Sequence, residues 1–190
     1  AGPAGGSTLR AGARPRADQA GIDSAANNSC AAPSARTVLF AAGNYPLRSQ
    51  ISIPCPKTAM VIQGTTPSGV GTTWPLTPTA ILTSTLTNSW AVRGSACGVG
   101  TTIQYLQFNG GDPSGGGGGF LFVPAGMNNL TVTYNWFYGN SAIASTSQFQ
   151  DTSVWLDRDG SSARTSGVTI KWNRFGNALN NDCAALMHLY

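Results

Sequence analysis

This chain contains little charge and few of the long side chains that build helices. Charged residues make up 9% of the sequence, Glu does not occur, and all seven acidic residues are Asp. Gly, Asn, Ser and Thr are abundant instead, and these residues favour turns and loops over helix interiors. An apolar content of 41% with so little charge excludes an intrinsically disordered chain. We therefore expect one folded domain in which helix is scarce.

Positive charge is too sparse and too unevenly placed to predict a nucleic-acid partner. Part of the net charge of +4 comes from Arg10, Arg14 and Arg16, which lie in the Gly-, Ala- and Pro-rich segment 1–16. We expect this segment to be a flexible arm, because three arginines without interleaved aromatic residues are typical of a solvated tail. No apolar run reaches the roughly 18 residues of a membrane-spanning helix, so no membrane span is expected.

Cysteine is scarce as well, and no pair has the Cys-x-x-Cys spacing of a metal site, so we expect no metal and no cofactor. The sequence starts with Ala-Gly-Pro-Ala-Gly-Gly, a small-residue segment typical of the position after a removed secretory signal. We therefore expect a secreted, extracellular protein, in which an even number of cysteines favours two disulfides. We favour Cys30 with Cys55 and Cys97 with Cys183, and the two other pairings and buried free thiols stay open.

Three stretches of the sequence are nearly alike. They start at Ile103, Val132 and Ile170, which lie 29 and then 38 residues apart. Apolar side chains alternate along each stretch, as in a strand with one buried face. A repeat of about 20–50 residues is typical of a solenoid.

A second short apolar strand, closed by Gly, precedes each repeat. These strands lie at Trp90–Gly94, Phe120–Gly126 and Val154–Gly160, and Leu186–Tyr190 starts a further one. Strands joined by turns and by loops of uneven length predict the coils of a parallel β-helix. We assign residues 17–190 to this all-β domain, in which the Ala-rich segment 17–26 forms a short cap helix over the first coil.

The segments after the expected cap helix resemble a known family. Val38–Leu47 reads Val-Leu-Phe-Ala-Ala-Gly-Asn-Tyr-Pro-Leu, Ile51–Pro54 reads Ile-Ser-Ile-Pro, and Val61–Gly64 reads Val-Ile-Gln-Gly. With the later Asn-x-Phe coils, they resemble right-handed parallel β-helix proteins of the pectate-lyase-like superfamily. The resemblance implies a right-handed parallel β-helix. It implies no single activity, because this superfamily includes lyases, glycoside hydrolases, tailspikes, adhesins and members without catalysis.

Hydrolysis of a sugar bond usually needs two carboxyl groups about 5–10 Å apart. Asp157 and Asp159 have i, i+2 spacing, which on a strand places both on one face about 6–7 Å apart. The same sequence suits a strand that ends in a turn, and we favour that structural interpretation. His188, the single His, titrates in the range useful for catalysis, but its apolar strand favours a packing role. These three residues are the catalytic candidates if the protein is an enzyme.

A lyase would use a basic residue together with Ca²⁺ held by carboxylates. Aligning the coils places Gln104, Thr133 and Lys171 on one outward row, with Arg174 three residues beyond Lys171. The carboxylates are too few, because Ca²⁺ takes about six to eight oxygen ligands. A lyase is therefore a weaker prediction than a hydrolase.

Aromatic and amide side chains suggest two further roles. Trp74, Trp136 and Trp155 are candidates to stack on sugar rings, in a groove that suits neutral glycans. Asn135 and Asn173 occupy equivalent coil positions, where amides can hydrogen-bond along the stack. Because several of these aromatic residues must pack in the core, sugar binding by the tryptophans stays one of two open interpretations, whereas we expect the asparagines to serve structure.

Size favours a structural protein over an enzyme. About four or five coils fit in this sequence, fewer than the catalytic members of the superfamily usually have, and Tyr190 falls within a strand pattern. An uncapped apolar end is a template for another coil, so we expect copies to stack head to tail into an extracellular filament or surface layer that associates with glycan. The alternative is a carbohydrate-active enzyme, a glycoside hydrolase or polysaccharide lyase, or a fragment of one.

Overall fold

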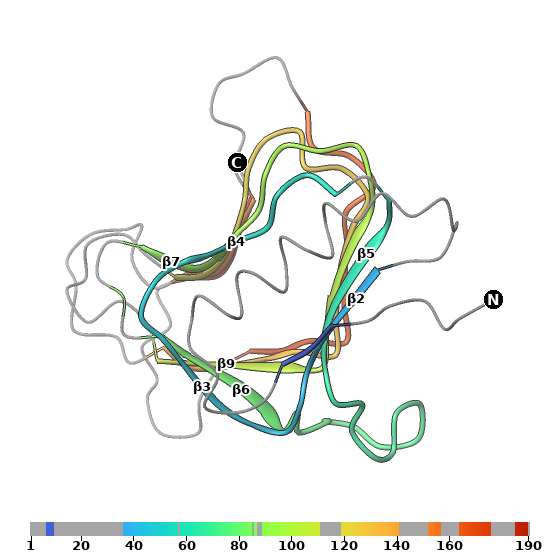
Figure 1. Ribbon diagram of the computed structural model, residues 1–190, viewed down its shortest axis with the longest axis vertical. Helices are drawn as coiled ribbons and strands as arrows, with labels where there is room; N and C mark the ends of the chain where they lie inside the picture. The colour runs from blue at the N-terminus through green and yellow to red at the C-terminus, as the bar shows by residue number, and fades with distance from the viewer. Residues whose placement is uncertain are drawn as a thin grey trace.

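The computed structural model is an all-β protein that winds as a three-sided coil (Figure 1). The structure describes residues 7–9, 36–56, 58–84, 86, 89–110, 119–140, 152–156, 164–175 and 185–189. These residues contain strands and no helix. The predicted cap helix at 17–26 lies outside them.

The strands form three parallel sheets, and each complete coil contributes one strand to each sheet. In stacking order, sheet 1 contains β1 (Ser7–Leu9), β2 (Arg36–Phe40), β5 (Met60–Gly64), β8 (Thr101–Gln104), β11 (Leu130–Thr133) and β14 (Thr169–Lys171). Sheet 2 contains β4 (Ile51–Ser52), β7 (Trp90–Arg93), β10 (Gly119–Val123), β13 (Thr152–Leu156) and β16 (Ala185–Leu189). Sheet 3 contains β3 (Gly43–Leu47), β6 (Ala80–Ser84), β9 (Leu106–Gly110), β12 (Trp136–Asn140) and β15 (Arg174–Phe175). Each strand pairs with its equivalent one coil away, which is the topology of a parallel β-helix.

Strand register confirms the sequence repeats. Ile103 pairs with Val132, and Val132 pairs with Ile170, so the three similar stretches stack directly on one another. The second set of short strands also aligns, because Leu121 of β10 lies between Val92 and Val154 in sheet 2. The predicted final strand is present as β16, which pairs with β13.

The core is a set of apolar ladders along the coil axis. Ile103 and Val132 are at most 1% exposed, as the alternating pattern predicts. In sheet 3, the Phe137 ring stacks between Phe108 and Phe175, with centroid distances of 4.9 and 5.0 Å and interplanar angles of 10°. Equivalent side chains on successive coils therefore fill the interior by stacking on each other.

Asparagines extend this stacking to a corner between sheets 1 and 3. The Asn135 side chain is 2% exposed and accepts a hydrogen bond from the Leu106 N–H at 3.1 Å. Its Nδ2 donates to the Ile103 carbonyl at 2.9 Å and to Asn173 Oδ1 at 3.1 Å. Asn173 repeats the pattern by donating to the Val132 carbonyl at 2.8 Å. The predicted amide stack is confirmed.

The predicted outward row needs one correction. Gln104, Thr133 and Lys171 do stack in register, and Gln104 Nε2 donates to Gln63 Oε1 at 2.6 Å. Thr133 stands in the same row but is only 5% exposed, so the row is not uniformly accessible to solvent. Its short side chain lies in register between the longer side chains of Gln104 and Lys171, which explains its low exposure.

Part of the expected arm is a strand. Ser7–Leu9 form β1, which runs parallel to β2 with Ser7 opposite Val38. An edge strand presents unpaired N–H and C=O groups, and the sequence Ser-Thr-Leu is compatible with a strand that pairs there. Within the segment that we expected to be a flexible arm, these three residues therefore extend the first sheet of their own chain.

Candidate functional site

Three aromatic side chains lie one above another at the corner between sheets 1 and 3. Tyr105, Tyr134 and Trp172, which we call the corner stack, each follow a sheet 1 strand. The ring centroids are 5.6 Å apart between Tyr105 and Tyr134 and 5.0 Å apart between Tyr134 and Trp172, with interplanar angles of 23° and 26°. All three residues have positive φ, at 57°, 55° and 53°. The strand turns sharply there, and the following residues start sheet 3.

Positive φ is unfavourable for aromatic residues by roughly 1–2 kcal/mol each. The ring stack and the adjacent asparagine hydrogen bonds offset this strain, since the Tyr134 N–H also donates to the Trp172 carbonyl at 3.1 Å. Burial, with a further contribution from Tyr134, raises the pKa of the Tyr105 phenol. This phenol is therefore neutral at physiological pH, and the corner stack is a neutral aromatic surface on its Tyr105 side.

A long loop takes the place of the tight corner in an earlier coil. Residues 65–79 connect β5 to β6 and project from the corner between sheets 1 and 3 (Figure 1). The loop reaches beyond its own coil, because Gly71–Trp74 share a groove with Tyr134 and Trp172 from later coils. The groove has a volume of about 460 Å³. It brings together aromatic rings and hydroxyl groups from three different coils.

The groove exposes two indole rings. Trp74 is 55% exposed and Trp172 is 52% exposed. Thr72 and Thr73 add hydroxyl groups, and Thr72 Oγ1 donates to the Gly69 carbonyl at 3.2 Å. The lining therefore combines aromatic faces with neutral hydroxyls.

Sequence analysis identified only one of these two tryptophans. Trp74 was predicted as a sugar-binding candidate, together with Trp136 and Trp155. Trp172 was missed because the repeat was interpreted as continuous alternation, which assigns its side chain to a strand face. The signal that could have identified it is the Asn that follows both Tyr134 and Trp172, since an amide stack marks a corner.

The two other predicted sugar-binding residues lie elsewhere. Trp155 is half-buried on sheet 2, where Trp90 lies 6.2 Å away between ring centroids. Trp136 is half-buried on sheet 3, with Arg174 Cζ 4.0 Å from its ring centroid and Tyr138 4.7 Å away. Neither lines the groove, so the structure does not bring the three predicted tryptophans together.

The catalytic candidates are placed only in part. Asp157 and Asp159 lie outside the described residues, as do the other five Asp residues. His188 lies in β16 opposite Trp155 of β13. Within the described ranges, no group of three or more His, Cys, Asp or Glu could hold a metal ion. In the same part of the chain, no helix is long and apolar enough to cross a membrane.

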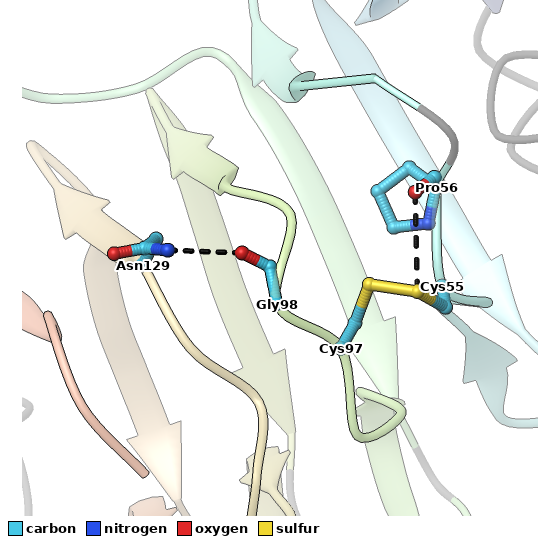
Figure 2. The surroundings of a disulfide bond; sticks show 5 residues. All are labelled: Cys55, Pro56, Cys97, Gly98 and Asn129. Carbon is cyan, nitrogen blue, oxygen red and sulfur yellow. Dashed lines mark hydrogen bonds between the residues drawn. A yellow bond between two sulfur atoms is a disulfide. The ribbon is translucent and has the colours of Figure 1, made fainter.

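The disulfide pairing differs from the one we favoured. Cys55 bonds to Cys97, so Cys30 with Cys55 and Cys97 with Cys183 are both wrong (Figure 2). The reason is coil stacking: Ile51 pairs with Val92, so residues about one coil apart in sequence lie side by side. The Cys55 and Cys97 Cα atoms are 5.2 Å apart, whereas Cys30 and Cys183 lie outside the described residues. A disulfide of this kind persists in oxidising compartments.

The disulfide is one of several side-chain links between successive coils at the corner between sheets 2 and 1. Next to Cys97, the Gly98 carbonyl accepts a hydrogen bond from Asn129 Nδ2 at 2.9 Å, one coil further on (Figure 2). Asn128 Oδ1 then accepts from the Ser166 N–H at 2.7 Å in the following coil. The corner is thus held covalently between the first two coils and by side-chain amides between later ones.

Reduction of the Cys55–Cys97 bond should lower the free energy of unfolding by about 2–4 kcal/mol, because it releases a constraint on a loop spanning 42 residues. Urea unfolding of the double variant Cys55→Ala, Cys97→Ala, compared with wild type, measures the loss. Mass spectrometry of peptides from unreduced protein should recover Cys55 linked to Cys97. Recovery of Cys55 linked to Cys30 would contradict the pairing.

The last described coil is more open than the coils before it. Its inward side chains Ile170 and Phe175 are only partly buried, whereas Val132 and Phe137, their equivalents one coil earlier, are at most 1% exposed. In the described part of the chain, β14 and β15 each have a paired neighbour on one side only. Together with β16, which also has one paired neighbour, this open coil presents apolar side chains and the edges of three strands.

Comparisons with protein-family models, with curated proteins and with solved structures gave no match. The strand order and register therefore carry the fold assignment by themselves: the chain is a parallel β-solenoid of three sheets.

Proposed function

We propose that this protein is a secreted structural β-helix protein that assembles end to end into an extracellular filament or surface layer. The observation that carries the proposal is the open coil, where Ile170 and Phe175 remain partly exposed. A second copy that continued the stack would bury these side chains and pair the edges of β14 and β15. The Cys55–Cys97 disulfide supports an oxidising location outside the cell.

The opposite end of the stack determines which groups a second copy could contact. Tyr45 and Leu47, the inward side chains of the first sheet 3 strand, are only 1% and 2% exposed. Head-to-tail contact would therefore rest on the strand edges of β3 and β4, each paired on one side only among the described residues. Two open coils that met directly would instead form a closed pair. The mass of the assembly distinguishes these arrangements.

The substitution Ile170→Lys should convert the assembly into single chains. A Lys at this partly buried position extends its ammonium group into the contact, where burial of an unpaired charge is unfavourable. Light scattering after size-exclusion chromatography measures the mass, and electron microscopy shows whether fibres form. Thr169→Lys is the matched control, because Thr169 is exposed on the same strand.

Open-ended masses and fibres for wild type and Thr169→Lys, with single chains for Ile170→Lys, support the filament. A wild-type protein that stays a single chain at high concentration overturns end-to-end assembly. A wild-type protein of twice the chain mass overturns the filament in favour of a closed pair.

We further propose that the coil is right-handed, as in the pectate-lyase-like superfamily. The segments that carry this resemblance coincide with β2, β3, β4 and β5, one turn of the stack and the start of the next. Parallel strands joined by crossovers are right-handed in nearly all proteins.

A further inference from the structure

We propose that the groove between the loop 65–79 and the corner stack binds a neutral polysaccharide, with a sugar ring held between the indoles of Trp74 and Trp172. The inference goes beyond end-to-end assembly and does not depend on it. The groove lies at the corner between sheets 1 and 3, where Trp172 joins β14 to β15 of the open coil, while Tyr134 and the loop belong to earlier coils.

Exposure of the two indoles is the first step of the argument. Among the described residues, Trp74 and Trp172 are the large hydrophobic side chains that are more than half exposed, and both line this groove. They come from segments about 100 residues apart in sequence and from different coils. A soluble protein that gathers exposed apolar side chains in one place usually does so to bind something.

The shape of the lining is the second step. The volume of about 460 Å³ falls within the range of sites that hold small organic ligands. Gly71, Thr72 and Thr73 are all exposed along the loop wall, so the groove is accessible from solvent. No atom lies within 4 Å of the position that a Cβ atom would occupy at Gly71, so there is open space beside the loop backbone. The groove therefore has open space beside the loop for part of a ligand.

The chemistry of the lining selects the ligand class. The aromatic rings of Trp74, Tyr134 and Trp172 offer apolar faces, while Thr72 and Thr73 offer hydroxyls that donate and accept. A pyranose ring has the matching character, with C–H groups on its faces and hydroxyls around its edge. None of the described residues that line the groove carries a charge, so the carboxylates of an acidic polymer would find no ionic partner among them.

Lys171 lies at the rim and does not change this choice. Its Nζ lies 4.2 Å from the centroid of the Trp172 ring, and the residue is exposed. Such a contact is worth about 0.5–1 kcal/mol at an exposed site. A sugar ring that covers more of the indole can displace it, and the ammonium group then remains free in solvent.

The rings of the corner stack follow one another along the coil axis, so the groove runs in that direction. Equivalent corner residues repeat along the coil axis at about 4.8 Å, the spacing of paired strands. Tyr134 lies between Tyr105 and Trp172, so both of its faces are covered, and Trp172 offers the less covered ring. The ligand should therefore contact Trp172 face-on and Tyr134 by the ring edge. A linear polymer lying along the axis fits this arrangement.

The test is binding of neutral oligosaccharides by isothermal titration and by indole fluorescence. The probes are cellohexaose, laminarihexaose, xylohexaose and mannohexaose, with oligogalacturonate as the acidic comparison. Wild type should bind at least one neutral probe, with no loss of affinity at about 1 M salt, where charge interactions are screened within about 3 Å. Trp74→Ala and Trp172→Asn should each weaken binding about tenfold or more. Asn is chosen at 172 because it tolerates the left-handed backbone.

Trp90→Ala is the control, because Trp90 is a half-buried aromatic residue on sheet 2, outside the groove lining. It should leave the affinity within about twofold of wild type. The proposal is overturned if no neutral probe binds, if binding survives both groove substitutions, or if only oligogalacturonate binds and salt abolishes it. Repeating the titration with Ile170→Lys separates the two proposals, since sugar binding should persist when assembly is lost.

Discussion

Asn135→Ala should lower the free energy of unfolding by about 3–5 kcal/mol. The Asn135 side chain is 2% exposed and satisfies the Leu106 N–H and the Ile103 carbonyl, which belong to residues that are each 1% exposed. Each buried backbone group that loses its partner costs about 1–3 kcal/mol, and the missing side chain leaves a small cavity as well. This is a large share of the roughly 5–15 kcal/mol that stabilises an ordinary domain.

The midpoint of urea unfolding, followed by circular dichroism, measures this loss. Asn44→Ala is the matched control, because Asn44 is an exposed Asn that accepts one hydrogen bond, from Thr83 Oγ1 at 2.6 Å. It should cost no more than about 0.5 kcal/mol. Equal losses for the two variants would mean that the amide stack contributes nothing beyond an ordinary surface hydrogen bond.

The coil repeats were predictable because the strand register of a β-helix requires similar residues at regular intervals along the sequence. Ile103, Val132 and Ile170 must each be apolar to fill the same layer, so their spacing reveals the stack without any long-range information. Asn135 and Asn173 were identified for the same reason. Equivalent positions of stacked coils need similar side chains, and this requirement produces the repeat in the sequence.

What the repeats do not encode was missed or mistaken. Alternation suggested that Trp172 continues a strand, but backbone at φ 53° turns there and leaves the indole half exposed. The disulfide was misassigned because the four cysteines do not recur at regular spacing along the sequence, so no repeat indicates which of them lie on neighbouring coils. Its pairing follows only from the register of Ile51 with Val92. The groove depends on how far the loop 65–79 reaches along the axis, which no local pattern specifies.

Phe137→Ala should lower the free energy of unfolding by about 4–5 kcal/mol. The Phe137 ring is 1% exposed and lies between Phe108 and Phe175 at 4.9 and 5.0 Å. Truncation of a buried Phe costs about 3–5 kcal/mol, and two stacked ring contacts are lost with it. Urea unfolding measures the loss, and Phe137→Leu, which retains most of the volume, should cost clearly less.

Phe175→Ala, in the same stack of Phe rings, tests whether the stability of the chain depends on assembly. In a single chain, Phe175 is only partly buried, so its truncation should cost less than that of Phe137. If a second copy covers the open coil, the cost should grow with protein concentration, because association stabilises the folded state by mass action. Unfolding midpoints at several concentrations measure this dependence. A cost that equals that of Phe137→Ala at every concentration would contradict the open coil itself, since Phe175 would then be as fully enclosed as its neighbour.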